Sequence, residues 1–177
     1  MSEILAEIDT FFETIFPNAE LRAKVWPILA AHVSGENREK YFTIWLGDGC
    51  NGKSTLNHLM QAALRTKAAS LSSDCLIKGL TTRENIIIST VHYVSIEAPQ
   101  EDELICTDHL KSVIANNAHV HMECTTLPTF DKQDIELAKR IRVIPFAAKI
   151  ANPEPMGEKI QCWAPHFFAR LQSIEHV

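Results

Sequence analysis

The chain has 177 residues, of which 46% are hydrophobic, and it carries a formal net charge of −5. This length suits one domain with a sizeable core, and no segment approaches the apolar length that a membrane span requires. The acidic charge disfavours a dedicated nucleic-acid binder, which is usually basic overall or carries a basic stripe. It does not exclude an NTPase that holds DNA through a few residues in a ring pore.

The start of the chain and its cysteines indicate a soluble, intracellular protein. Residues 1–5 have neither a basic start nor an apolar signal core, so we expect no secretion signal. The five cysteines are dispersed, without a C-x-x-C pair: Cys50, Cys75, Cys106, Cys124 and Cys162. An odd, scattered set favours reduced thiols over a disulfide framework or a zinc site.

The first forty residues predict two helices. Apolar residues recur at helical spacing over 4–16, and a short break follows. Asn18 can cap a second helix over 19–33, in which Pro27 should cause a kink or mark a boundary. A turn then leads into the first strand. We therefore expect residues 1–38 to form a small helical collar or lid.

A buried strand, a glycine-containing loop and a helix come next. Residues 41–46 predict the strand and residues 55–64 the helix. Residues 47–55 connect this strand to the helix and include its first residue. They fit G-x-x-x-x-G-K-[ST], the Walker A phosphate loop. The loop comprises Gly47, Asp48, Gly49, Cys50, Asn51, Gly52, Lys53, Ser54 and Thr55. The competing interpretation, a surface turn before a capped helix, needs a chance match that average composition makes rare.

This loop predicts a site for ATP and Mg²⁺. Glycines allow successive backbone N–H groups to surround an anion, and the helix N-terminus adds a partial positive charge. We expect Lys53 to reach the β- and γ-phosphates and the Ser54 hydroxyl to complete the shell of Mg²⁺. Cys50 could be reactive near a helix N-terminus, but such a residue is more often a small filler.

The rest of the chain alternates strands with helices. Strands are predicted over 91–97, 119–125 and 140–146, and helices over 101–116, 131–138 and 158–174. Periodicity does not decide between helix and strand for 82–88; residues 66–79 should hold short elements, and 152–155 a loop. This alternation around a phosphate loop predicts an α/β fold with a largely parallel sheet flanked by helices. The core would cover 39–150, followed by a linker and terminal helix over 151–177.

Glu97 closes a predicted buried strand. A carboxylate at the carboxyl end of such a strand can face the γ-phosphate, so Glu97 is the predicted catalytic residue, orienting the attacking water and supporting Mg²⁺. The alternative is that it begins the next loop in solvent. His119 and His121 share one strand face and could hold a metal. Without a third ligand at a recognisable spacing, partly buried strand histidines are favoured.

Four features together resemble the superfamily 3 helicases, above all the primase-helicase ATPase domain of poxviruses and other large DNA viruses and related phage and plasmid primases. The phosphate loop contains the N-G-K-S typical of that family. The strand ending in Glu97, with Pro99 two residues later, looks like its Walker B segment. The helix carrying Leu110-Lys111 looks like the following segment, and the run at 139–146 (KRIRVIPF) is similar to the family's arginine-bearing strand.

The resemblance implies a P-loop NTPase with a modified AAA+ fold that hydrolyses ATP at the subunit interfaces of a homo-oligomer, a ring of the hexamer type. It implies movement along single-stranded DNA in viral or phage-type replication, in the host cytoplasm or nucleus, with a primase among the implied partners and no membrane. It also suggests that Arg140, or less closely Arg142, reaches a neighbouring subunit's nucleotide as an arginine finger. Both arginines could instead cover an exposed sheet edge.

Two departures from the family leave other functions open. Thr125 stands where the family usually has a sensor asparagine that contacts the γ-phosphate, and an amide both donates and accepts more readily. Residues 112–118 replace a longer stretch that includes a pore hairpin, which leaves Lys111 and the nearby histidines as candidates for DNA contacts. The alternatives are a non-motor structural or regulatory subunit and a small-molecule kinase.

Overall fold

Five parallel strands form one sheet, in a computed structural model that describes residues 3–151 and 155–174. The strand order is β2-β3-β4-β1-β5. Every neighbouring pair is parallel, so the carboxyl ends of all five strands meet at one edge. The strands are β1 (Phe42–Leu46), β2 (Ala68–Leu71), β3 (Tyr93–Glu97), β4 (His119–Cys124) and β5 (Ile141–Pro145). The predicted α/β fold with a parallel sheet is confirmed.

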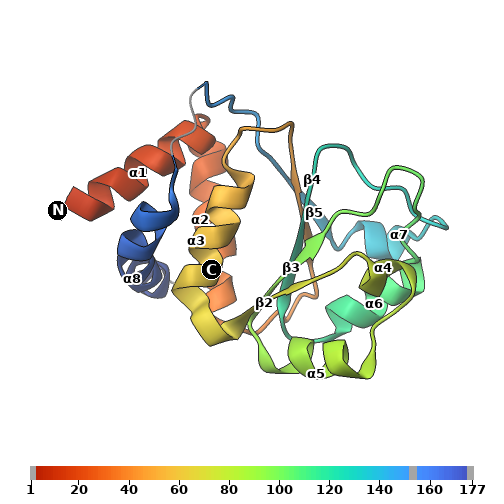
Figure 1. Ribbon diagram of the computed structural model, residues 1–177. Helices are drawn as coiled ribbons and strands as arrows, with labels where there is room; N and C mark the ends of the chain where they lie inside the picture. Colours follow the sequence, from red (N-terminus) through yellow and green to blue (C-terminus); the bar gives the residue numbers. More distant parts are fainter. Residues whose placement is uncertain (1–2, 152–154, 175–177) are drawn as a thin grey trace.

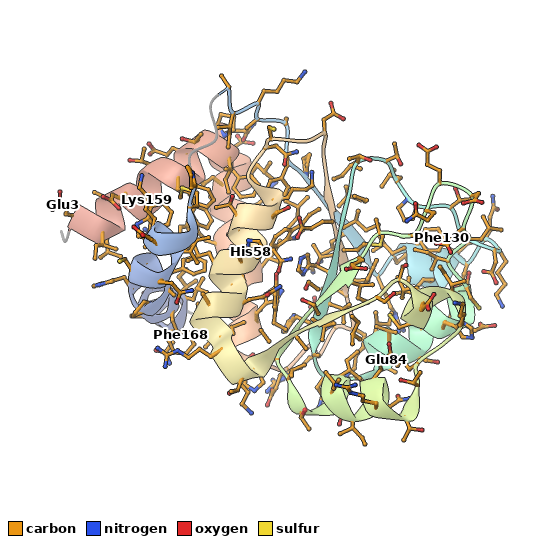
Figure 2. The ribbon with its side chains drawn as sticks, viewed as in Figure 1. Glu3, His58, Glu84, Phe130, Lys159 and Phe168 are labelled. Carbon is orange, nitrogen blue, oxygen red and sulfur yellow. The ribbon has the colours of Figure 1, made fainter. Side chains whose placement is uncertain are left out.

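Helices cover both faces of the sheet (Figure 1). One layer contains α1 (Glu3–Ile15), α2 (Ala19–Ser34), α3 (Lys53–Leu64) and α8 (Gly157–Ser173). The other contains α4 (Asp74–Ile77), α5 (Thr82–Thr90), α6 (Thr107–Ala115) and α7 (Ile135–Ala138), and a short 3₁₀ turn, η1 (Arg65–Lys67), follows α3. In Figure 2, His58 of α3 lies on one side of the sheet, and Glu84 and Phe130 lie on the other. No helix in the described ranges is long and apolar enough to cross a bilayer.

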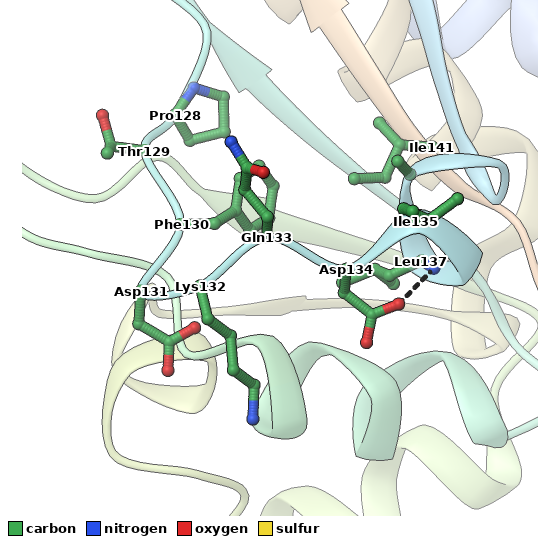
Figure 3. Close-up of a pocket in the computed structure, with 11 residues that line it drawn as sticks. Pro128, Thr129, Phe130, Asp131, Lys132, Gln133, Asp134, Ile135, Leu137 and Ile141 are labelled. Atoms are coloured by element: carbon green, nitrogen blue, oxygen red, sulfur yellow. Dashed lines mark hydrogen bonds between the residues drawn. The ribbon is translucent and has the colours of Figure 1, made fainter.

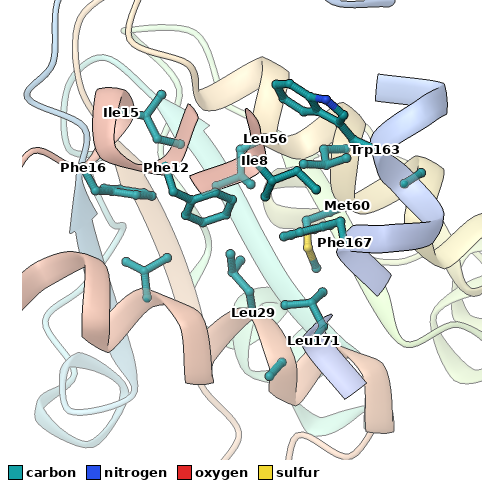
Figure 4. Close-up of a cluster of buried hydrophobic side chains, with 14 of the residues drawn as sticks. Ile8, Phe12, Ile15, Phe16, Leu29, Leu56, Met60, Trp163, Phe167 and Leu171 are labelled. Carbon is teal, nitrogen blue, oxygen red and sulfur yellow. The ribbon is translucent and has the colours of Figure 1, made fainter. Parts of the chain in front are cut away.

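The first layer is held by one apolar cluster that joins both ends of the chain (Figure 4). Phe12 of α1 is fully buried and stacks on Trp26 of α2, with ring centroids 4.0 Å apart. Phe167 of α8 packs against the same two rings. Leu56 of α3 belongs to this cluster, so α1, α2 and α8 pack directly against the helix that follows the phosphate loop. The division at residues 38 and 150 stays a prediction.

The helix predicted over 101–116 is wrong in its first half, because α6 begins only at Thr107. The preceding residues are drawn to the β4–β5 connection: Ile105 N–H donates to Thr129 O at 2.9 Å. The Thr107 N–H donates to Asp131 Oδ1 at 2.9 Å. Backbone groups that would have continued the helix are therefore used in tertiary contacts, which override local propensity.

Other boundaries follow from capping and burial. Asn18 caps α2 as predicted, accepting from the Leu21 N–H at 2.9 Å, but α2 runs through Pro27 to Ser34. The helix buries Val25, Leu29 and Ala30, and this burial offsets the hydrogen bond that proline cannot make. Residues 82–88 are helical, behind a Thr81–Glu84 capping box. The predicted helix 131–138 is reduced to α7. Most of the predicted loop at 152–155 lies outside the described residues.

One histidine of α2 and two of β4 lie among aromatic rings. His121 is fully buried between Trp45 and Tyr93, with ring centroids 4.1 Å and 4.9 Å away. The ring centroid of His32 lies 4.6 Å from that of His119. Burial lowers the pKa of His32 well below its ordinary range, and burial lowers the pKa of His121 to about 3. No group of three His, Cys, Asp or Glu side chains among the described residues is arranged to hold a metal ion.

The free energy of unfolding is expected to fall as the pH drops below about 6.5. Histidines of the unfolded chain bind protons there, whereas His32 and His121 stay neutral in the fold, so the unfolded state binds more protons. Each histidine then contributes a loss of about 1 kcal/mol between pH ~6.5 and ~5.5. Urea unfolding across this range measures the loss. His121→Phe keeps a ring in the stack and should reduce it; an unchanged pH dependence in that variant would contradict this account.

Candidate functional site

The phosphate loop lies at the carboxyl edge of the sheet, between β1 and α3 (Figure 1). Its backbone has positive φ at Cys50 (58°) and Gly52 (87°), and such left-handed positions let neighbouring N–H groups converge on an anion. Within the described ranges, no hydrogen bond uses the backbone N–H groups of residues 48–52. A Cβ added at Gly49 would meet open space. The loop therefore presents N–H donors in an accessible place.

The segment after β5 holds the loop from one side. Phe146 N–H donates to Leu46 O at 2.7 Å, and Ile150 N–H donates to Cys50 O at 2.8 Å. Asn51 is buried, and its amide donates to Phe146 O at 3.2 Å and also to Asp48 O. This clamp explains why an asparagine stands inside the loop, and it gives the end of the arginine-bearing strand a structural role that motif matching did not predict.

Two glycines of the loop are required by close packing. A Cβ at Gly47 would lie 2.3 Å from Phe146 O, and one at Gly52 would lie 2.3 Å from Ile15 Cγ2 of α1. Gly52 also needs its left-handed backbone. Helix α1 thus supports the loop directly.

Lys53 begins α3, and its ammonium lies beneath the loop. It is only 7% exposed. Nζ donates to Gly47 O, to Asp48 O at 3.2 Å and to Asn51 Oδ1 at 3.2 Å. Burial lowers the pKa of Lys53, and the carboxylate of Glu123 acts against that shift. The side chain is thus oriented by two loop carbonyls and an amide oxygen.

A second carboxylate, which motif matching did not identify, contacts the phosphate loop. Glu123 lies near the end of β4; its Oε2 accepts from Ser54 Oγ at 2.9 Å and its Oε1 from Asn57 Nδ2 at 2.6 Å. Asn57 Oδ1 in turn accepts from the hydroxyl of Tyr93 at 2.9 Å. A polar residue between buried ones in the strand H-V-H-M-E-C was the only sequence signal for Glu123.

Glu97 lies where the sequence places it, at the carboxyl end of β3. Tyr93 and Ser95, which share its face, contact α3 through Asn57 and Gln61, so Glu97 points to the phosphate-loop side of the sheet. It is exposed, and no described residue makes a hydrogen bond or ion pair with its side chain. Its register partner on β4 is Glu123. The catalytic role of Glu97 stays a prediction.

Thr125 lies beside the phosphate loop, directly after β4. It lines a cavity of about 290 Å³ together with Gly47, Asp48 and residues 145–149. Its side chain is exposed. The structure thus brings Thr125 close to the start of the loop. Thr55, the last residue of the predicted loop, lies in the first turn of α3.

Arg140 and Arg142 lie at the amino ends of the strands, whereas the phosphate loop lies at the carboxyl ends. Ile141 pairs with Phe42 at the amino ends of β5 and β1, whereas the phosphate loop follows the carboxyl end of β1. Arg140, directly before β5, is exposed and far from the loop of its own chain. Arg142 packs over the Tyr41 ring at 3.1 Å and donates to Glu39 at 3.1 Å. Arg142 is therefore used within the chain, and Arg140 is the arginine left to reach outward.

A larger cavity, of about 720 Å³, lies away from this site in the β4–β5 connection (Figure 3). Its wall is mostly apolar, and its Lys132 donates to Asp108 at 2.7 Å. Asp134 caps α7 and pairs with Lys111. The charged groups around this cavity are thus already paired, so its volume alone does not make it a phosphate site.

The residues of the phosphate loop fit ATP and Mg²⁺. N–H donors without internal partners and a buried ammonium suit a polyphosphate. A serine hydroxyl and carboxylate oxygens are ligands that Mg²⁺ prefers, and Ser54, Glu123 and Glu97 supply them at one edge of the sheet.

Comparison with known proteins found no matching family model. Putative helicase 022R of Frog virus 3 (isolate Goorha) is 26% identical over 169 residues, which cover 81% of this chain and 17% of that protein. Putative helicase L207/L206 of Acanthamoeba polyphaga mimivirus is 23% identical, covering 90% of this chain and 19% of that protein. The chain thus spans less than a fifth of the length of these relatives.

A solved structure shares the fold over nearly the whole chain. The C-terminal region of NrS-1 aligns with 99% of this chain and 46% of its own, with a TM-score of 0.71 and 16% identity. Putative helicase 121R of Invertebrate iridescent virus 3 is 34% identical, but over only 45% of this chain. The resemblance to superfamily 3 viral helicase domains that the motifs predict is thereby confirmed.

Proposed function

We propose that this chain binds and hydrolyses Mg·ATP as the ATPase domain of a viral DNA-replication motor. The observation that carries the proposal is the phosphate loop itself. Its N–H groups and the Lys53 ammonium lie at the same edge of the sheet as two carboxylates, Glu97 and Glu123. Loop N–H groups and Lys53 would hold the phosphates, and Ser54 would hold Mg²⁺. The metal, when bound, neutralises charge that develops on the phosphates. Glu97 would orient the attacking water.

An oligomer would complete this site. Because Arg140 lies at the amino edge of the sheet and the loop at the carboxyl edge, this arginine can serve only the nucleotide of another copy. A ring in which each chain offers Arg140 to its neighbour fits this polarity. Arginine fingers stabilise charge in the transition state of phosphoryl transfer.

Arg140→Ala should lower ATP turnover by about 10³-fold or more if the arginine acts across subunits. Mixing it with Lys53→Ala should restore part of the activity, because some interfaces then pair an intact loop with an intact arginine. Turnover is followed at several mixing ratios. Arg142→Ala is the matched control, since Arg142 is engaged with Tyr41 and Glu39. An absence of recovery at every ratio would count against an arginine finger.

The short connection between α6 and β4 favours a second candidate, a non-motor subunit that binds nucleotide. Only residues 116–118 separate α6 from β4, and Lys40 holds this turn by donating to Asn116 O at 3.1 Å and Asn117 Oδ1 at 2.9 Å. Lys111, a predicted DNA contact, is paired with Asp134. These features leave no pore hairpin in this segment.

Steady-state hydrolysis with single-stranded DNA titrated in distinguishes the two candidates. A motor should hydrolyse ATP faster in the presence of DNA, and its DNA affinity should fall steeply with salt. Turnover that DNA does not change, with nucleotide binding intact, would favour the non-motor subunit. Solution mass with and without Mg·ATP, measured on the same sample, reports whether the chain assembles.

A further inference from the structure

We propose that Glu123 is the positioning residue on the metal side of this site. Its carboxylate orients the Ser54 hydroxyl and supplies the negative charge that favours Mg²⁺ beside the bound nucleotide, which leaves Glu97 for the attacking water. The inference rests on the proposed function. The sequence predicts that Glu97 both supports Mg²⁺ and orients the water. Here the first task falls to Glu123 of β4 and the second stays with Glu97 of β3.

The contacts of Glu123 fix its carboxylate in place. One oxygen accepts from Ser54 Oγ at 2.9 Å and the other from Asn57 Nδ2 at 2.6 Å. Asn57 is itself held by the hydroxyl of Tyr93, a fully buried side chain. The carboxylate is therefore oriented by a helix and a strand of the rigid core. Partners that orient a ligand in this way are typical of metal sites.

The strand order explains why Glu123, and not Glu97, reaches the serine. Strand β4 lies between β1 and β3, so the end of β4 is one strand nearer to the phosphate loop. Glu97 and Glu123 are register partners on the same face, but their surroundings differ. Glu123 is half-buried and accepts two hydrogen bonds, whereas Glu97 is exposed. An exposed carboxylate suits contact with water, and a held one suits a metal with strict geometry.

Glu123→Gln tests the assignment because it removes the charge and keeps the shape. Binding of a fluorescent ATP analogue is measured in EDTA and then with Mg²⁺ titrated in. We expect the Mg²⁺ concentration for half-maximal tightening to rise at least tenfold, while affinity in EDTA stays the same or improves. The exposed Glu101→Gln is the control and should leave this concentration within twofold. Glu97→Gln should raise it less than Glu123→Gln does. A purely structural defect would weaken binding equally with and without Mg²⁺.

Glu123→Asp provides a second measurement, because it keeps the charge but shortens the side chain, and it should give an intermediate Mg²⁺ requirement. Thermal unfolding of each variant checks the fold. An unchanged Mg²⁺ requirement in both Glu123 variants, or a shift in Glu97→Gln alone, would overturn the inference and leave ATP binding by the loop intact. A wild-type chain that binds no nucleotide under either condition would overturn the proposed function as well.

Discussion

Replacing Lys53 by alanine is expected to weaken binding of Mg·ATP by on the order of 100-fold or more and to abolish turnover. The Lys53 ammonium is buried under the loop, where it has only loop carbonyls and an amide oxygen as partners. Charge-assisted hydrogen bonds to the β- and γ-phosphates contribute about 1.5–3 kcal/mol each, and alanine removes them without a substitute. Calorimetric titration with Mg·ATP measures the loss of affinity.

The control for this variant is Lys67→Ala, an exposed lysine in the turn beyond the far end of α3. It removes the same charge and should leave affinity and turnover unchanged. Circular dichroism shows whether Lys53→Ala retains its fold, since the ammonium also bonds the loop. ATPase activity that survives in a folded Lys53→Ala protein would overturn the assignment of the phosphate loop.

Glu97→Gln is expected to slow ATP hydrolysis at least tenfold, a rise in the activation barrier of about 1.4 kcal/mol or more, while nucleotide affinity stays intact. The glutamine keeps the shape of the side chain but lacks the charge that orients a water for attack. Single-turnover hydrolysis and equilibrium binding, measured side by side, separate the two effects. Glu101→Gln, in the exposed turn after β3, should be neutral in both assays. A fall in affinity with an unchanged rate would move the catalytic carboxylate to another residue.

The sequence was sufficient to place the loop between a strand and a helix and to predict four of the five strands, because these are local patterns: β1, β3, β4 and β5 each show a run of apolar residues. The short strand β2 lies in a segment, 66–79, that shows no such run and was expected only to hold short elements. Helix 101–116 failed because the Ile105 and Thr107 amides bond to the β4–β5 connection. That contact joins segments about 24 residues apart, and no periodicity within a window reports it.

Glu123 could not be identified from the sequence for a topological reason. Its role depends on β4 lying between β3 and β1 in the sheet, although β3 precedes β4 in the chain. The sequence pattern that indicates a catalytic carboxylate is an acidic residue at the end of a buried strand, and Glu97 fits that pattern. The clamp of Asn51 by Phe146 O has the same origin, since these residues are 95 positions apart. Such contacts come from the arrangement of strands.

A crystal structure with Mg²⁺ and a non-hydrolysable ATP analogue would show directly whether this loop holds the nucleotide. We expect the β- and γ-phosphates within hydrogen-bonding distance of the backbone amides of residues 48–54 and of Lys53 Nζ, with Glu123 beside the metal and Glu97 toward the γ-phosphate. A nucleotide bound elsewhere, for instance in the cavity lined by residues 128–135, would contradict it. So would phosphates in the loop with both carboxylates turned away from them.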